Sequence, residues 1–145
     1  MTKAQLLKHP LVELAMQGSW DIHLRGDEVK PMLFVDQTDR PLIIPLNIFP
    51  SKDAWAALIA KFRPNTSVLV MVAEAWIASG TEKEVKAVAP RDNPNSIEAV
   101  IVTVYHGTEV HQFTRQIKPD AKKWETKDSK ICGGRLIDDT TAGLN

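Results

Sequence analysis

The stretch that decides the fold is Ser67–Ala78, SVLVMVAEAWIA, in which a single acid interrupts an apolar run. The run is rich in valine and falls well short of the roughly 20 apolar residues that a membrane-spanning helix needs. This pattern is typical of a central β-strand that is covered on both faces. Side chains alternate along a strand, so Val72, Glu74 and Trp76 are expected to share one face.

Three explanations of Glu74 are open. An arginine can neutralise the carboxylate inside the fold, and the available cations are Arg91, Arg115 and Arg135. The strand end can instead reach solvent, or the carboxylate can act in a pocket beside Trp76, as a small hydrolase-like enzyme would require. We favour the ion pair, for which Glu74→Ala would cost about 3 to 5 kcal/mol by stranding the cation.

A hairpin is expected before the central strand. Pro31–Val35 and Leu42–Leu46 are short β-prone runs, and the residues between them have the composition of a turn. Prolines at 31, 41 and 45 remove ladder donors, which favours short or edge strands.

A second hairpin is expected after the central strand. Ile97–Tyr105 and Glu109–Ile117 alternate as strands, and His106–Gly107 suits a tight two-residue turn. That turn would set Glu98 opposite Arg115.

The first 25 residues predict a helix followed by a strand. Thr2 and Gln5 have capping-box spacing, and apolar residues recur at helical intervals until Gly18, with a kink or split at Pro10. Ser19–Arg25 then alternates apolar and polar residues, which favours a half-buried strand.

The most regular helical pattern follows Ser51, a suitable N-cap. Trp55, Leu58, Ile59 and Phe62 form one apolar stripe of that helix. Together the elements predict an α+β fold, with a mostly antiparallel sheet of about six or seven strands packed against one or two helices.

The length of 145 residues predicts one globular domain, over residues 1–137, followed by a flexible tail over 138–145. A last strand is expected over Lys130–Ile137. Gly80–Ser96 is a long polar segment with two prolines, longer than most structureless connections.

Charge and cysteine content narrow the functional classes. Lysine and arginine total 18, and aspartate and glutamate total 18, so no net field attracts nucleic acid or an anionic membrane. The single cysteine, Cys132, excludes an internal disulfide and fits a reducing compartment. The N-terminal segment lacks the continuous apolar core of a signal peptide, so we expect a cytoplasmic protein with no membrane association.

Other chemical motifs are weak. The histidines at 9, 23, 106 and 111 have no metal-ligand spacing, and nothing places one beside Cys132 to activate it. Lysines within Lys118–Lys130 surround Trp124, which would suit a weak single-stranded nucleic-acid binder, but acids dilute the charge. A loop or short helix whose tryptophan plugs the core is the favoured interpretation. The sequence indicates no metal and no cofactor.

One block of residues carries a resemblance. The chain resembles a pattern in small uncharacterised bacterial and phage-type proteins. The pattern consists of Ala73–Trp76 at the end of an apolar strand, a proline-bearing loop, the strand of Glu98, then Arg115 and Gly134–Arg135. The resemblance covers roughly residues 26 to 137 and implies no activity. Such proteins carry Asp-Arg before the glutamate strand, where this chain has Asn95 and Ser96.

These observations favour a non-enzymatic binding or protein-interaction domain, because no catalytic set is assembled. The expected partner is a protein or a second copy of the chain. The candidate site, or structural ion-pair network, consists of Glu74, Trp76, Arg91, Glu98, Arg115 and Arg135.

Overall fold

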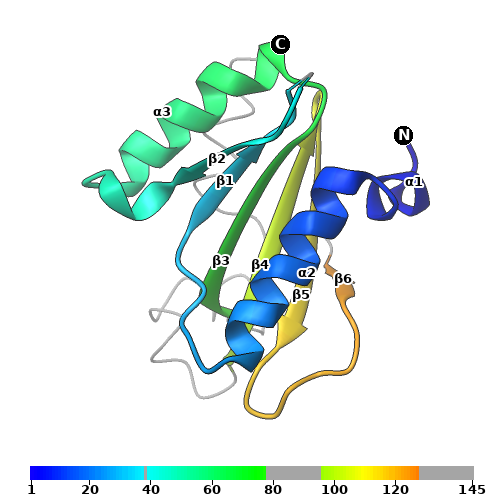
Figure 1. Ribbon diagram of the computed structural model, residues 1–145, viewed down its shortest axis with the longest axis vertical. Coiled ribbons are helices and arrows are strands. Elements are labelled where there is room, and N and C mark those ends of the chain that lie inside the picture. Colours follow the sequence, from blue (N-terminus) through cyan, green and yellow to red (C-terminus); the bar gives the residue numbers. More distant parts are fainter. Residues whose placement is uncertain (38, 78–95, 128–145) are drawn as a thin grey trace, which may run out of the picture.

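The computed structural model describes residues 1–37, 39–77 and 96–127. They form a six-stranded sheet in the order β2-β1-β3-β4-β5-β6, with every neighbouring pair antiparallel. Two helices, α2 and α3, pack on this sheet (Figure 1). The predicted α+β class is therefore confirmed.

The strands are β1 (Met32–Val35), β2 (Leu42–Pro45), β3 (Leu69–Ile77), β4 (Ile97–His106), β5 (Glu109–Gln116) and β6 (Glu125–Lys127). The helices are α1 (Lys3–Leu7), α2 (Pro10–Leu24) and α3 (Lys52–Phe62), with short 3-10 turns at Leu46–Ile48 and Arg63–Asn65.

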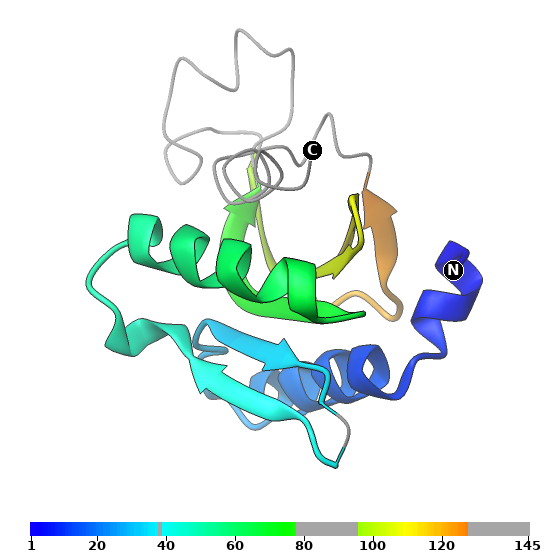
Figure 2. The same ribbon diagram turned by 90° about the horizontal axis from the view of Figure 1, so that it is seen from above.

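The apolar run is the strand β3, which pairs with β1 on one side and β4 on the other. Side chains alternate between the two faces of β3, so its residues contribute to two separate hydrophobic cores. Val70 and Val72 belong to the cluster under α2, whereas Leu69 and Met71 belong to the cluster under α3. Both faces of β3 are thus covered over its first half, as the valine-rich sequence predicts (Figure 2).

The N-terminal helix is split at Pro10, as predicted. Thr2 closes a capping box with Gln5 at the start of α1. His9 caps α2 by accepting the Leu11 amide on its Nδ1, and Pro10 occupies the first helical position.

The strand predicted over Ser19–Arg25 is wrong, because α2 continues to Leu24. Val12, Met16 and Trp20 recur every four residues and are all buried in the α2 core. Packing of this stripe on the sheet outweighs the helix-weakening effect of Gly18, which is roughly 1 kcal/mol.

Both predicted hairpins and the helix after Ser51 are present. Ser51 accepts the Ala54 amide at the start of α3. The strand β2 is an edge strand, as its prolines indicate, whereas β1 lies inside the sheet.

The predicted register of the second hairpin is wrong by two residues. His106 pairs with Glu109 and does not lie in the turn, so the two-residue loop is Gly107–Thr108. Gly107 has φ +58° at the first loop position, where hairpin turns favour glycine. The residue opposite Arg115 is therefore Val100 and not Glu98.

The segment after β5 differs from expectation in one respect, because it contains the short strand β6. The strand predicted over Lys130–Ile137, the tail over 138–145 and residues 80–95 of the long polar segment lie outside the described residues. Within the described ranges, no helix is long and apolar enough to cross a membrane.

Candidate functional site

The predicted site residues that the structure describes share the α2 side of the sheet. Glu74 pairs with Val100, and Val100 pairs with Arg115. Trp76 pairs with Glu98 in the next row. Directly opposed residues of antiparallel strands point to the same face. Alternation and register therefore bring these side chains to one end of one face.

Glu74 is held by the main chain. Its Oε1 accepts a hydrogen bond from the backbone amide of Val29 over 2.9 Å, and its own amide donates to the Val29 carbonyl over 3.3 Å. Val29 is 1% exposed, so this amide has little access to water. The carboxylate thus satisfies a backbone donor in the segment that leads into β1.

Within the described residues, no arginine or lysine forms an ion pair with Glu74. Arg91 and Arg135 lie outside those residues, so pairing with either one stays a prediction.

Arg115 lies two strands away from Glu74 and is engaged elsewhere, so it is not the partner among the three candidate arginines. Its Nε donates to the carbonyl of Ala121 over 2.8 Å, and its guanidinium lies 3.8 Å from the centre of the Trp20 ring. Burial lowers the pKa of Arg115 below its ordinary value, and the negative charge of Asp120 acts in the opposite direction.

Trp76 and Glu98 mark the exposed end of this face. The Trp76 side chain is 45% exposed. The Glu98 carboxylate lies 3.4 Å from Nζ of Lys118, whose side chain is 79% exposed. An exposed pair of this kind contributes little to stability.

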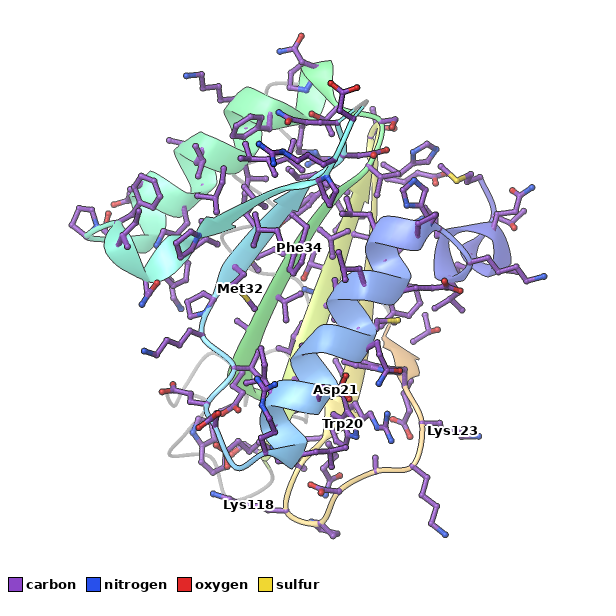
Figure 3. The ribbon with its side chains drawn as sticks, viewed as in Figure 1. Trp20, Asp21, Met32, Phe34, Lys118 and Lys123 are labelled. Carbon is purple, nitrogen blue, oxygen red and sulfur yellow. The ribbon has the colours of Figure 1, made fainter. Side chains whose placement is uncertain are left out.

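An aromatic cluster joins the end of α2, where Figure 3 labels Trp20, to the loop between β5 and β6. The Trp20 ring lies 4.8 Å from the His23 ring and edge-on to Trp124 at 6.1 Å. His23 Nε2 lies 2.6 Å from Oδ1 of Asp120. The cluster therefore fastens the loop that carries Lys118 and Trp124 to the helix.

The sequence did not reveal this cluster because of the misassigned strand. Residues 20 and 23 fall on opposite faces of a strand but on the same face of a helix. The signal that could have found them is the four-residue spacing of Val12, Met16 and Trp20.

The cluster lacks the parts of a hydrolytic site. A histidine bonded to a carboxylate can act as a general base when a nucleophile lies within reach. Among the described residues, however, no hydroxyl or thiol is hydrogen-bonded to His23. The described ranges also contain no group of three metal-ligating side chains. Cys132 lies outside them.

A hollow of about 620 Å³ lies between α2 and the segment that enters β6. Its volume is within the usual range for binding sites, roughly 300 to 1,000 Å³. Leu14 is 45% exposed on the helix wall. On the opposite wall, Trp124 packs against the α2 core, which agrees with the expectation that it plugs the core. The hollow is lined by Pro10, Glu13, Leu14, Met16, Gln17 and Trp124.

A more polar hollow of about 580 Å³ lies at the turn between β1 and β2. Asp36, one of two aspartates in its lining, accepts a hydrogen bond from Ser67 Oγ over 3.1 Å and lies 3.5 Å from His9 Nε2. These contacts tie the turn to α2 and β3, so Asp36 has a structural role there.

The register fixes which backbone groups of β6 face outward. The Ile117 amide donates to the Glu98 carbonyl, so odd-numbered residues of β5 bond to β4 and even-numbered residues bond to β6. Glu125 and Lys127 of β6 therefore bond to β5. The N–H and C=O groups of Thr126 point away from the sheet, beside the hollow.

The opposite edge of the sheet offers few outward donors. The Leu46 amide donates to the Pro31 carbonyl over 2.9 Å, so the odd-numbered residues of β2 face outward. One of these, Pro45, has no N–H group, and Pro41, which directly precedes β2, has none either. Ile43 is left as the outward donor of β2. Prolines at such positions are a known protection against edge-to-edge pairing.

Comparison with protein-family models, with curated proteins and with solved structures found no match. The resemblance to small bacterial and phage-type proteins stays a prediction.

Proposed function

We propose that this chain is a non-enzymatic protein-interaction domain that binds an extended protein segment along the edge of β6. The observation that carries the proposal is the contrast between the two edges. At β6 the N–H and C=O groups of Thr126 face outward beside a largely apolar hollow, whereas at β2 the outward residue Ile43 is flanked by Pro45 and by Pro41 just before the strand, neither of which has an N–H to offer.

Strand addition uses this combination of features. Main-chain hydrogen bonds to an open edge give affinity, and a pocket beside the edge accepts alternate side chains. A strand paired with β6 would place every second side chain on the α2 side, where Leu14 and Trp124 form the walls of the hollow. Its intervening side chains would lie on the opposite face of the sheet.

The contacts of Glu74 support a binding role over a catalytic one. One carboxylate oxygen is occupied by the amide of a nearly fully buried residue, Val29. Acid or base chemistry at that oxygen would break a contact that the fold uses.

The surroundings of Trp124 give less support to nucleic-acid binding. Its ring packs against the core and lies edge-on to Trp20, so it does not offer a free stacking platform. Lys118 and Lys123 project outward from the loop (Figure 3). They are solvated charges in a protein whose net charge is zero. A cytoplasmic location fits this proposal and the cysteine content.

A displayed library of random peptides tests the proposal. Selection on the wild-type protein, with counter-selection on Thr126→Pro, should enrich peptides that pair with β6, because proline removes the outward donor without touching the ladder to β5. Ile43→Pro is the matched control, since it removes the outward donor of the other edge.

The selected peptides should bind the wild-type protein and Ile43→Pro equally and lose affinity for Thr126→Pro. Their addition should shift the backbone amide resonances of Trp124 and Thr126. Peptides that bind all three proteins alike, or that shift β2 instead, would contradict the proposal.

A further inference from the structure

We propose that the segment bound by β6 is β6 of a second copy of this chain, so that the two sheets join into one through a two-fold axis at Thr126. This inference rests on the proposed function, because it names the partner of the same edge. Two-fold symmetric dimers, in which the same surface of each copy meets, are the commonest assemblies of identical chains.

The hydrogen bonding is self-complementary. Thr126 presents both N–H and C=O outward, and an antiparallel pair centred on this residue would satisfy both groups in each copy. The two threonine side chains would be directly opposed on the α2 side, a pairing that is favourable in sheets.

The charges are also self-complementary. Centring the pair on Thr126 sets position 125 of one copy opposite position 127 of the other, and the reverse. The sequence has Glu125 and Lys127 at these positions. Each copy would thus meet an opposite charge twice, and opposed charges of unlike sign stabilise antiparallel strands.

The apolar surface beside the edge would be covered by the same contact. Leu14 is 45% exposed and lies in the hollow on the α2 side of β6. A second copy placed along β6 would bring its own hollow toward the same axis. Leu14 and Trp124 of the two copies would then shield one another from water.

The alternative pairing through β2 lacks the charge match. Pro41 and Pro45 each lack an outward donor, and β2 carries no charged residue over Leu42–Pro45. A pair centred on Ile43 would keep its two hydrogen bonds, but it would gain no donor from positions 41 and 45 and would have no charge match.

Charge reversal gives the sharpest test. In Glu125→Lys, residue 125 would meet a lysine in the second copy, and in Lys127→Glu residue 127 would meet a glutamate. The dimer of each variant alone should have a dissociation constant at least about tenfold higher than that of the wild-type dimer. An equimolar mixture should restore a dimer, because lysines at 125 and 127 of one chain then face glutamates of the other.

Sedimentation equilibrium of the full chain measures these masses over a range of concentrations. The wild-type protein and Ile43→Pro should reach a dimer mass, and Thr126→Pro should stay monomeric. The mixture does not depend on the folding of Thr126→Pro, because its two components differ from the wild-type protein by one side chain each.

A wild-type protein that stays monomeric at all concentrations overturns the inference, and so does a mixture that remains monomeric. A dimer that Ile43→Pro abolishes overturns it as well. The proposed function fails separately, when peptide binding by the monomer is insensitive to Thr126→Pro.

Discussion

The Glu74 side chain and the Val29 backbone form a two-point contact between β3 and the segment that enters β1. Val29 donates its amide to the carboxylate over 2.9 Å, and its carbonyl accepts the Glu74 amide over 3.3 Å. The strand β1 begins at Met32, so Glu74 lies beyond the last residue that pairs with it. The side-chain oxygen extends the hydrogen bonding of β3 past the end of its neighbour. This explains an acid at the end of an apolar strand.

Replacing Glu74 should therefore cost less than loss of a buried ion pair. Glu74→Ala leaves the Val29 amide without an acceptor, which should destabilise the fold by about 1 to 3 kcal/mol. Glu74→Gln keeps an acceptor oxygen and should cost less than about 1 kcal/mol. Urea denaturation with a constant slope measures both free energies of unfolding.

Equal losses for the two variants would show that the negative charge matters more than the acceptor. A loss above about 3 kcal/mol for Glu74→Ala would point to a cation partner, as with Arg91 or Arg135.

Local signals in the sequence predicted most of the elements. The valine-rich run, the proline-bounded hairpin and the cap at Ser51 each act within a few residues, and each element is present. The alternation of Trp20, Ile22 and Leu24 was misleading, because Trp20 also continues a four-residue helical repeat from Val12 and Met16. That repeat is visible only when Gly18 is taken as part of the helix and not as its end. Tertiary packing decided between the two periods.

The site residues were less predictable than the elements. Backbone amides are present at every residue except proline, so no sequence pattern could name Val29 as the partner of Glu74. The strand β6 is three residues long, too short to show a period. Its outward groups follow from the registers of the neighbouring strands, and the register of β5 depended on which residues form the turn at Gly107.

Two of the described glycines, Gly18 and Gly107, should respond in opposite ways to replacement by alanine. Gly18 lies within α2, and a methyl group there would meet no atom within 4 Å apart from its own chain neighbours and helix backbone. Gly18→Ala should stabilise the protein by about 0.5 to 1 kcal/mol. Gly107 has φ +58°, so Gly107→Ala should destabilise it by about 1 kcal/mol although the space is open.

Thermal and urea unfolding of the two alanine variants check these signs. A destabilised Gly18→Ala protein would argue that α2 ends near Gly18, as the strand interpretation of Ser19–Arg25 requires.

The pKa of the Glu109 carboxyl should depend on the presence of His111. The hydrogen bond between Glu109 Oε2 and His111 Nε2, 3.2 Å long, lowers the pKa of the carboxyl below its ordinary value of 4.5. A lowered folded-state pKa means that the contact stabilises the fold above pH 4.5 and that this contribution is lost as the pH falls through the folded value. NMR titration of the side-chain carboxyl carbon measures the midpoint.

His111→Ala should raise that midpoint toward 4.5, because it removes the hydrogen bond and the imidazole charge. His23→Ala is the control, since His23 contacts Asp120 instead. A midpoint that does not move in His111→Ala would show that the contact is absent in solution.

The edge at β2 should pair with strands of other molecules when Pro41 and Pro45 are replaced. Pro41→Thr together with Pro45→Thr restores two outward N–H groups next to Ile43, whose side chain is 48% exposed. An apolar edge with regularly spaced donors is a template for strand pairing. We expect the double variant to form species heavier than the wild-type protein as concentration rises, measured by light scattering after size exclusion.

Pro50→Thr, an exposed proline outside β2, should leave the mass unchanged, since it adds no donor to the edge. Combining the double variant with Ile43→Pro should suppress the heavier species, because one outward donor in the middle of the strand is lost again. If the double variant keeps the wild-type mass throughout, the prolines do not protect this edge, and the contrast on which the proposed role of β6 rests loses its force.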